Sequence, residues 1–315
     1  MNHIEIGVSI IILLALVGSA ILTGLVRHLA IIDVPNERSS HSQPTPRGGG
    51  ISLVAMTIIG LVCSQMLWRL TSWRGLIVYV VAATLIAMVS WLDDLQSISA
   101  KARFLVHFIA AGLIVAEWGY CGNFHFSRLG NIQLGQFGIL LTLLWIVGLT
   151  NAYNFMDGID GIAGGQAFVA GTGWAIVGWM INDKFVFAIG GLLAASSLGF
   201  LFYNWSPAKI FMGDVGSAFL GFTFAVVPLI AARPAVDNQD YMFWIGFLLV
   251  WPFIADTGFT LLRRLRRGEN IFQAHRSHLY QRMVIAGHSH QIVSLLYIGL
   301  AIIGSIISLV ITKKN

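Results

Sequence analysis

The segment NAYNFMDGIDG, residues 151–161, places amide and carboxylate side chains three residues apart between two apolar runs. Its four spaced polar residues are Asn151, Asn154, Asp157 and Asp160. Consecutive members would share one helix face, and Gly158 and Gly161 would let the backbone approach a bulky group. Carboxylate and amide oxygens suit a hard cation, and amide NH groups suit an anion. The alternative without chemistry is an Asx-rich helix cap.

Two adjacent carboxylates, Asp93 and Asp94, stand in WLDDLQS at the end of another apolar run. Neighbouring side chains on a helix point about 100° apart. We therefore expect the two aspartates to have different roles, with one facing a ligand or metal. The alternative is an acidic pair that only terminates the run.

A third polar segment, NWSPAKIFMGDVGS at residues 204–217, contains Asn204, Lys209 and Asp214. Gly213 and Gly216 stand on either side of Asp214, which predicts a tight turn that holds this carboxylate where phosphate and metal both come near. A plain turn is the alternative.

The motif HRSH groups His275, Arg276 and His278, three side chains suited to phosphate oxygens. Zinc binding by the two histidines is the alternative, but it would need a third nitrogen or sulfur ligand, and the sequence places none nearby.

The proline- and glycine-rich segment PNERSSHSQPTPRGGG, residues 35–50, supplies Arg38, His41 and Arg47. Such a segment is equally typical of a binding loop and of a simple connection.

These segments together indicate phosphoryl chemistry. Several carboxylates imply Mg2+ or Mn2+, because hard divalent ions prefer oxygen ligands and Mg2+ keeps waters and substrate phosphates in its shell. The Arg and His residues imply anionic substrates. The sequence contains no GxxxxGK[ST] motif, so an ATP-driven motor is not supported.

The elements that must position these residues are membrane spans. A mean hydropathy of +0.78, with 57% hydrophobic and 10% charged residues among 315, predicts an all-α polytopic membrane protein. We expect one domain, residues 1–315, with about ten transmembrane helices. The ten expected spans are approximately Ile6–Val26, Gly50–Leu67, Gly75–Leu92, Ala102–Trp118, Phe137–Tyr153, Ile162–Ile181, Phe185–Phe202, Ala218–Ala231, Tyr241–Ala255 and Ile292–Ile311.

An even number of spans puts both termini on one side of the membrane. Each of the five polar segments follows an odd-numbered span, so all five lie on the other side. Lys and Arg divide 12 to 7 in favour of the side with the polar segments, so we expect an active-site cleft on the cytoplasmic face. The arginines of the segment from Asp256 to Met283 alternate with apolar residues, which suits a helix in the headgroup layer. The few basic residues serve membrane topology and lipid headgroups, so we expect no nucleic-acid partner.

The blocks PTPRGGG, WLDD, NAYNFMDGIDG, NWSPAKIFMGDVGS and HRSHLYQR, in this order, resemble the polyprenyl-phosphate N-acetylhexosamine-1-phosphate transferases along essentially the whole chain. The resemblance implies a Mg2+-dependent enzyme (Mn2+ as a substitute) of the bacterial inner membrane, in a family whose members often form homodimers. Its activity would be transfer of a sugar 1-phosphate from a UDP-HexNAc to undecaprenyl phosphate, with release of UMP.

The resemblance also assigns roles by position. Asp93 and Asp94 match an acidic pair that handles the lipid phosphate and the metal, and Asp214 matches the magnesium ligand. Asp157 and Asp160 would shape the nucleotide and metal site. Asn151, Asn154 and Asn204 match amides near the uridine diphosphate, and His275 and His278 match the family's histidine motif, expected near the diphosphate as catalytic residues. The cations Lys209, Arg47 and Arg276 are further expected substrate contacts, chosen from the residues themselves.

Two departures from the family pattern affect the substrate. Many relatives carry a lysine in the first polar loop, where this chain offers Arg47 and His41, so the cation for the carrier phosphate stays open. HRSH stands where the phospho-MurNAc-pentapeptide transferases have a run of histidines. The muramoyl-pentapeptide is therefore the alternative, less favoured substrate. HRSHLYQR resembles more closely the transferases that initiate O-antigen and other surface polysaccharides on UDP-GlcNAc or on 6-deoxy sugars such as UDP-FucNAc or UDP-QuiNAc.

Three other classes fit less well. A secondary transporter would place its ionisable groups at mid-bilayer, whereas these lie at span ends. A phosphotransferase acting on CDP-activated head groups would need Asp-Gly followed by Ala-Arg, but Ile159 and Asp160 follow here. A non-catalytic assembly protein would not need such acidic loops.

Overall fold

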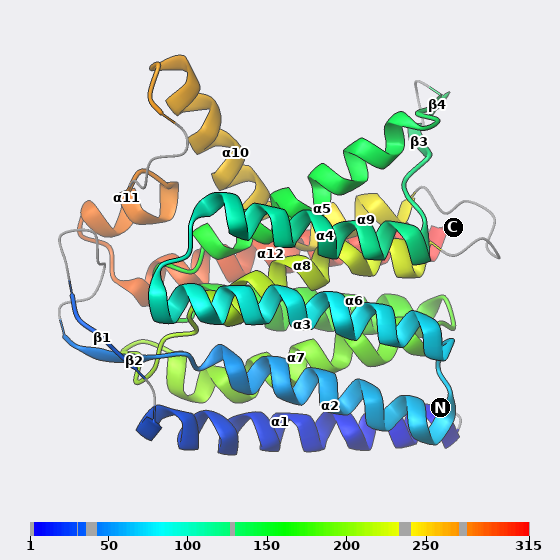
Figure 1. Cartoon of the computed structure of the whole chain (residues 1–315), viewed down its shortest axis with the longest axis horizontal. Helices are drawn as coiled ribbons and strands as arrows, with labels where there is room; N and C mark the ends of the chain where they lie inside the picture. Colours follow the sequence, from blue (N-terminus) through cyan, green and yellow to red (C-terminus); the bar gives the residue numbers. More distant parts are fainter. Residues whose placement is uncertain are drawn as a thin grey trace.

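The computed structural model describes residues 3–29, 31–35, 43–126, 130–232, 241–270 and 276–314, and within them the fold is helical with two small β-hairpins (Figure 1). This confirms the predicted all-α polytopic class. Within these described ranges, seven helices are long and apolar enough to cross a membrane. They are α1 (His3–Leu29), α2 (Gly50–Trp68), α3 (Trp73–Gln96), α5 (Phe137–Phe155), α7 (Lys184–Asn204), α8 (Asp214–Ala231) and α12 (His290–Lys314).

The remaining expected spans differ from this group in composition or continuity. Helices α4 (Ala100–Trp118) and α6 (Ile162–Met180) run alongside the long helices in Figure 1. Their hydropathy or charge keeps them outside the seven: α4 carries Lys101, Arg103 and Glu117, and α6 is rich in glycine. Counting one bent helix pair as a span raises the number to eight.

The expected span Tyr241–Ala255 is not one continuous helix, because the helix breaks at Val250. α9 (Tyr241–Leu249) and α10 (Trp251–Arg266) meet at an angle of 79°. Pro252 lacks an NH and so cannot continue the hydrogen-bond ladder of α9. The Phe253 NH donates to the Val250 carbonyl at 3.1 Å, and the Leu249 carbonyl that it would reach in a continuous helix accepts the side-chain amide of Gln166 at 2.7 Å. α10 therefore departs from the bundle direction (Figure 1) and carries Asp256 with it.

Glycines bring α6 and α7 into close backbone contact. A Cβ on Gly190 would lie 2.4 Å from the Ala175 nitrogen, and one on Gly178 would lie 2.3 Å from the Phe187 nitrogen. In a lipid solvent such small residues allow the close packing that stabilises helix pairs. The rigid pair positions the site, because α6 begins directly after the NAYNFMDGIDG segment and α7 ends at Asn204.

Both chain termini lie at one end of the bundle (Figure 1), as the even span count predicts. The opposite end carries the antiparallel hairpin of β1 (Ile31–Asp33) and β2 (Thr45–Arg47), together with α11 (Leu279–Ile285). A second hairpin, β3 (Asn123–Phe126) and β4 (Gly130–Gln133), lies at the end of the termini.

Candidate active site

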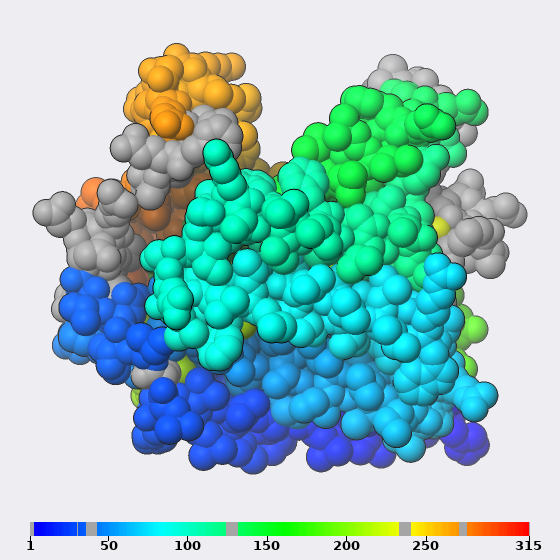
Figure 2. Space-filling view, viewed as in Figure 1, coloured from blue at the N-terminus to red at the C-terminus, as the bar shows by residue number. Residues whose placement is uncertain are grey.

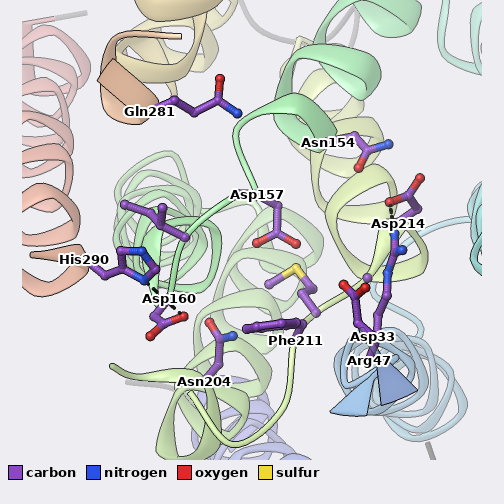
Figure 3. A pocket seen from close by; sticks show the side chains of 14 residues that line it. Asp33, Arg47, Asn154, Asp157, Asp160, Asn204, Phe211, Asp214, Gln281 and His290 are labelled. Atoms are coloured by element: carbon purple, nitrogen blue, oxygen red, sulfur yellow. Dashed lines mark hydrogen bonds and ion pairs between the residues drawn. The ribbon is translucent and has the colours of Figure 1, made fainter. Parts of the chain in front are cut away.

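A polar pocket opens at the end of the bundle that carries β1, β2 and α11 (Figure 3). Loops far apart in the sequence form its walls: the α5–α6 loop, the α7–α8 loop, the β1–β2 hairpin and the first turns of α11 and α12. The lining residues are Asp33, Arg47, Asn154, Asp157, Gly158, Ile159, Asp160, Asn204, Phe211, Met212, Gly213, Asp214, Gln281 and His290. The structure thus brings together six of the residues selected from sequence.

Asp94 caps the start of α8 from another helix. Its two carboxylate oxygens accept hydrogen bonds from the backbone NH groups of Asp214, at 3.1 Å, and Val215, at 3.2 Å. The N-terminus of a helix attracts an anion, because its NH groups are unpaired and the helix dipole is positive there. Asp94 therefore orients Asp214 without itself lining the pocket, and its expected role as a metal ligand stays a prediction.

Arg47 joins the first polar loop to this helix start. Its guanidinium lies 2.6 Å from Asp94 Oδ1 and 2.7 Å from Asp214 Oδ1. The backbone fixes this position, because Gly48 and Gly49 both donate to the Phe211 carbonyl, at 3.1 and 2.9 Å. Burial lowers the pKa of Arg47, but Asp214 and Asp94 outweigh that effect and leave it raised.

Arg103, a residue that the sequence analysis did not select, stands on the other side of Asp214. Its Nη1 lies 3.7 Å from Asp214 Oδ2 and also pairs with Asp93 Oδ2. Asp93 Oδ1 accepts the backbone NH of Ile98 at 2.6 Å. Asp93 and Asp94 thus have different partners, as their adjacent positions predict, and each reaches Asp214 through an arginine.

The Asp157 side chain points into the middle of the pocket (Figure 3), and its carboxylate makes no hydrogen bond or ion pair with the residues the structure describes. Burial raises its pKa, and the nearby charge of Asp214 raises it further. Arg47 lowers it by less, so the pKa of Asp157 reaches about 7. This carboxylate is therefore short of positive charge, which favours binding of a cation or a proton.

Asp160 has the opposite environment. Its Oδ2 accepts the backbone NH of Ala208 at 3.1 Å, and its Oδ1 lies 3.4 Å from His290 Nδ1. Burial would raise the pKa of Asp160, but these partners leave it lowered. His290 was not among the residues selected from the sequence, and its place in the pocket wall is a finding of the structure.

The amides divide between the pocket and the helix packing. Asn204 bridges two loops, because it accepts the Gly161 NH at 3.0 Å and donates to the Ile210 carbonyl at 3.0 Å. Asn154 also lines the pocket and accepts a hydrogen bond from Ser217 Oγ at 2.9 Å. Asn151 lies outside the pocket lining, with its amide between the Val147 carbonyl and the ring of His107.

Other predicted residues lie outside the pocket. His278 is buried, and its Nδ1 lies 3.2 Å from Asp256 Oδ1. Lys209 and Arg276 do not line the pocket. The predicted residues His275, His41 and Arg38 fall outside the described part of the chain.

The donor set fits a magnesium ion that shares its ligands with a substrate. Across the described ranges, no three His, Cys, Asp or Glu side chains form a ready-made metal cage. The zinc alternative depends on His275, which lies outside the described residues, so it stays open. Mg2+ characteristically takes one or two carboxylates and completes its shell with waters and phosphate oxygens. Asp157 and Asp214 line one pocket, and the unpaired carboxylate of Asp157 is the kind of ligand that such an ion requires.

Known proteins resemble this chain along most of its length. Residues 76–232 match glycosyl transferase family 4. The chain is 32% identical to a probable undecaprenyl-phosphate N-acetylglucosaminyl 1-phosphate transferase of Bacillus subtilis, over 96% of this chain and 84% of the relative. It is 34% identical to the decaprenyl-phosphate N-acetylglucosaminephosphotransferase of Mycolicibacterium smegmatis, over 92% of this chain and 80% of the relative.

A phospho-N-acetylmuramoyl-pentapeptide-transferase of Enterococcus hirae is more distant, at 27% identity over 84% of this chain and 83% of the relative. The family match covers the WLDD, NAYNFMDGIDG and FMGDVGS blocks that form or support the pocket. The chain belongs to glycosyl transferase family 4, the polyprenyl-phosphate hexosamine-1-phosphate transferases.

Proposed function

We propose that this protein transfers N-acetylglucosamine 1-phosphate from UDP-GlcNAc to undecaprenyl phosphate. A phosphate oxygen of the lipid attacks the β-phosphorus of the UDP-sugar, the bond from that phosphorus to the bridging oxygen breaks, and UMP leaves with the electron pair. The products are undecaprenyl-diphosphate-GlcNAc and UMP. The observation that supports this most is the pocket in which Asp157 and Asp214 lie beside Arg47.

The residues of the chain would act mainly by position and charge. Both reactants are anions, so they repel each other, and catalysis of phosphoryl transfer depends on neutralising that charge. Arg47 and His290 line the pocket and would face phosphate or nucleotide oxygens. A phosphate monoester is already largely ionised near neutral pH. Asp93 would therefore orient the arginine beside it and would not need to remove a proton.

Mg2+, or Mn2+ in its place, would be held by Asp214 and Asp157 and would supply charge neutralisation at the diphosphate. We propose that the pocket faces the cytoplasm of a bacterial inner membrane, because Lys and Arg are in excess on that side of the chain. The lipid product would then begin an O-antigen or another surface polysaccharide. A homodimer stays a prediction.

The donor sugar is the finer part of the proposal. The names of the relatives from Bacillus subtilis and Mycolicibacterium smegmatis favour GlcNAc over a 6-deoxy sugar such as FucNAc or QuiNAc. A UDP-MurNAc-pentapeptide donor has less support, because the phospho-N-acetylmuramoyl-pentapeptide-transferase is a more distant relative. One hydroxyl separates several of these sugars, so pocket contacts decide the choice.

A donor panel tests the proposal. Purified protein in lipid nanodiscs would receive undecaprenyl phosphate, Mg2+ and, in turn, UDP-GlcNAc, UDP-FucNAc, UDP-QuiNAc or UDP-MurNAc-pentapeptide, with UMP and lipid-linked product both measured. We expect UMP from UDP-GlcNAc only when undecaprenyl phosphate is present, and loss of that release with EDTA. No release from any donor, or a preference for the muramoyl donor, would contradict the proposal.

A further inference from the structure

A buried aspartate outside the pocket lining, Asp256, connects three helices. It lies on α10 with 1% of its surface exposed. Its Oδ1 accepts hydrogen bonds from His278 Nδ1 at 3.2 Å and from the Leu279 NH at 2.8 Å. Its Oδ2 accepts the Tyr280 NH at 3.1 Å and the Tyr297 hydroxyl at 2.5 Å. One carboxylate therefore joins α10, α11 and α12.

These bonds fix the start of α11. A helix of seven residues has few internal hydrogen bonds and is marginal by itself. Asp256 satisfies two of its unpaired NH groups from outside the helix, and the imidazole of His278, the residue before the helix, binds the same carboxylate. The position of α11 thus depends on a side chain that the break between α9 and α10 places beside it.

α11 in turn supports the loop that carries Asp157. The Tyr280 hydroxyl donates to the Phe155 carbonyl at 3.0 Å, and a Cβ on Gly158 would lie 2.0 Å from the Tyr280 hydroxyl oxygen. The buried ring of Tyr280 therefore packs directly against the backbone on both sides of Asp157. Gln281, the next residue of α11, lines the pocket (Figure 3).

We propose that Asp256 is a positioning residue for the transfer reaction. It holds α11, so that Tyr280 fixes the backbone from Phe155 to Gly158 and thereby the direction of the Asp157 carboxylate. The kinetic part of this inference rests on the proposed function. The structural part does not, because it concerns the mobility of the loop.

Hydrogen exchange measured by mass spectrometry tests the structural part without any substrate. Asp256→Ala should raise the exchange of amides in residues 155–160, as well as those in α11, by about tenfold or more, because both segments lose their support. Tyr280→Phe removes only the hydroxyl at the far end, so it should raise exchange at residues 155–160 and leave the N-terminus of α11 protected. If Asp256→Ala fails to fold, this second variant decides.

Asp183 offers a matched control, since it caps α7 in the same way. Its Oδ1 accepts the NH groups of Phe185 at 2.9 Å and Val186 at 3.0 Å. It stands at the opposite end of a 21-residue helix, about 30 Å from Asn204 in the pocket wall. Asp183→Ala should therefore leave exchange at residues 155–160 unchanged.

The kinetic part is read from UMP release with undecaprenyl phosphate and UDP-GlcNAc. Asp256→Ala should lower kcat/KM by about 10- to 100-fold, and the double variant with Tyr280→Phe should be no worse, because both changes remove one chain of support. Asp183→Ala should stay within about twofold of the wild type. Unchanged exchange at residues 155–160 in Asp256→Ala, or full additivity in the double variant, would overturn the inference. An inactive wild type would count against the proposed function alone.

Discussion

At the scale of single residues, Asp157 shows how the site trades stability for function. Its pKa of about 7 lies above the ordinary value of 3.8, so the folded protein holds this proton more tightly than the unfolded chain does. Between these two values folding takes up a proton. Stability therefore falls as the pH rises from about 4 to about 7, and the charged carboxylate destabilises the fold above that range.

Asp157→Asn should consequently stabilise the protein while removing its activity. In metal-free buffer at about pH 8, we expect the Tm of the variant to exceed that of the wild type by about 2 °C or more, because the partly buried charge is gone. Near pH 5 the wild-type carboxyl is protonated and the two Tm values should converge. Thermal unfolding of both proteins across this pH range measures the difference. A wild type that is more stable than the variant at pH 8 would contradict the assigned pKa.

At the scale of elements, sequence pattern predicted most helices and the acidic loops but not their junctions. The break at Val250 was missed, since apolar residues continue through it and only Pro252 signals a stop. Arg103 and His290 were missed because each stands at the start of an apolar run and outside the polar motifs that the sequence analysis selected. Such positions depend on which helix ends meet, and hydropathy does not report that.

The starts of α2 and α8 form one such junction, and a glycine lets their backbones come into direct contact. A Cβ on Gly50 would lie 2.4 Å from the Gly216 Cα and 2.9 Å from the Met212 carbonyl oxygen, both of them backbone atoms. Gly50→Ala should therefore separate the two helix starts and move Arg47 away from Asp214. We expect UMP release to fall by about tenfold or more, with a loss of about 1–3 kcal/mol in stability.

Gly148→Ala is the control for this substitution. Gly148 lies within α5, and a Cβ there would meet no atom within 4 Å. Alanine has a higher helix propensity than glycine, so activity and Tm should be unchanged or slightly raised. Equal activity in the Gly50→Ala and Gly148→Ala proteins would show that the close contact of α2 and α8 does not matter to the site.

At the scale of the whole molecule, the fold gathers its charged loops at one end of an apolar bundle. The space-filling view shows the α10 arm and the upper part of α5 standing apart above the packed body (Figure 2). The pocket residues come from segments as far apart as Asp33 and His290. The order of the spans alone predicted this grouping. An even number of spans separates each of these loops from the next, so they all lie on the same side. The contacts within the group needed the structure.

The most direct test of this shared site is the transfer activity of Asp157→Asn and Asp214→Asn, singly and together, with Asp183→Asn as the control. The two aspartates line one pocket, so each single variant should lose about a thousandfold in UMP release, with the protein still folded by its Tm, and the double variant should lose little more. Asp183→Asn should keep its activity. Turnover within about tenfold of the wild type in either pocket variant would contradict a single catalytic site built from both carboxylates.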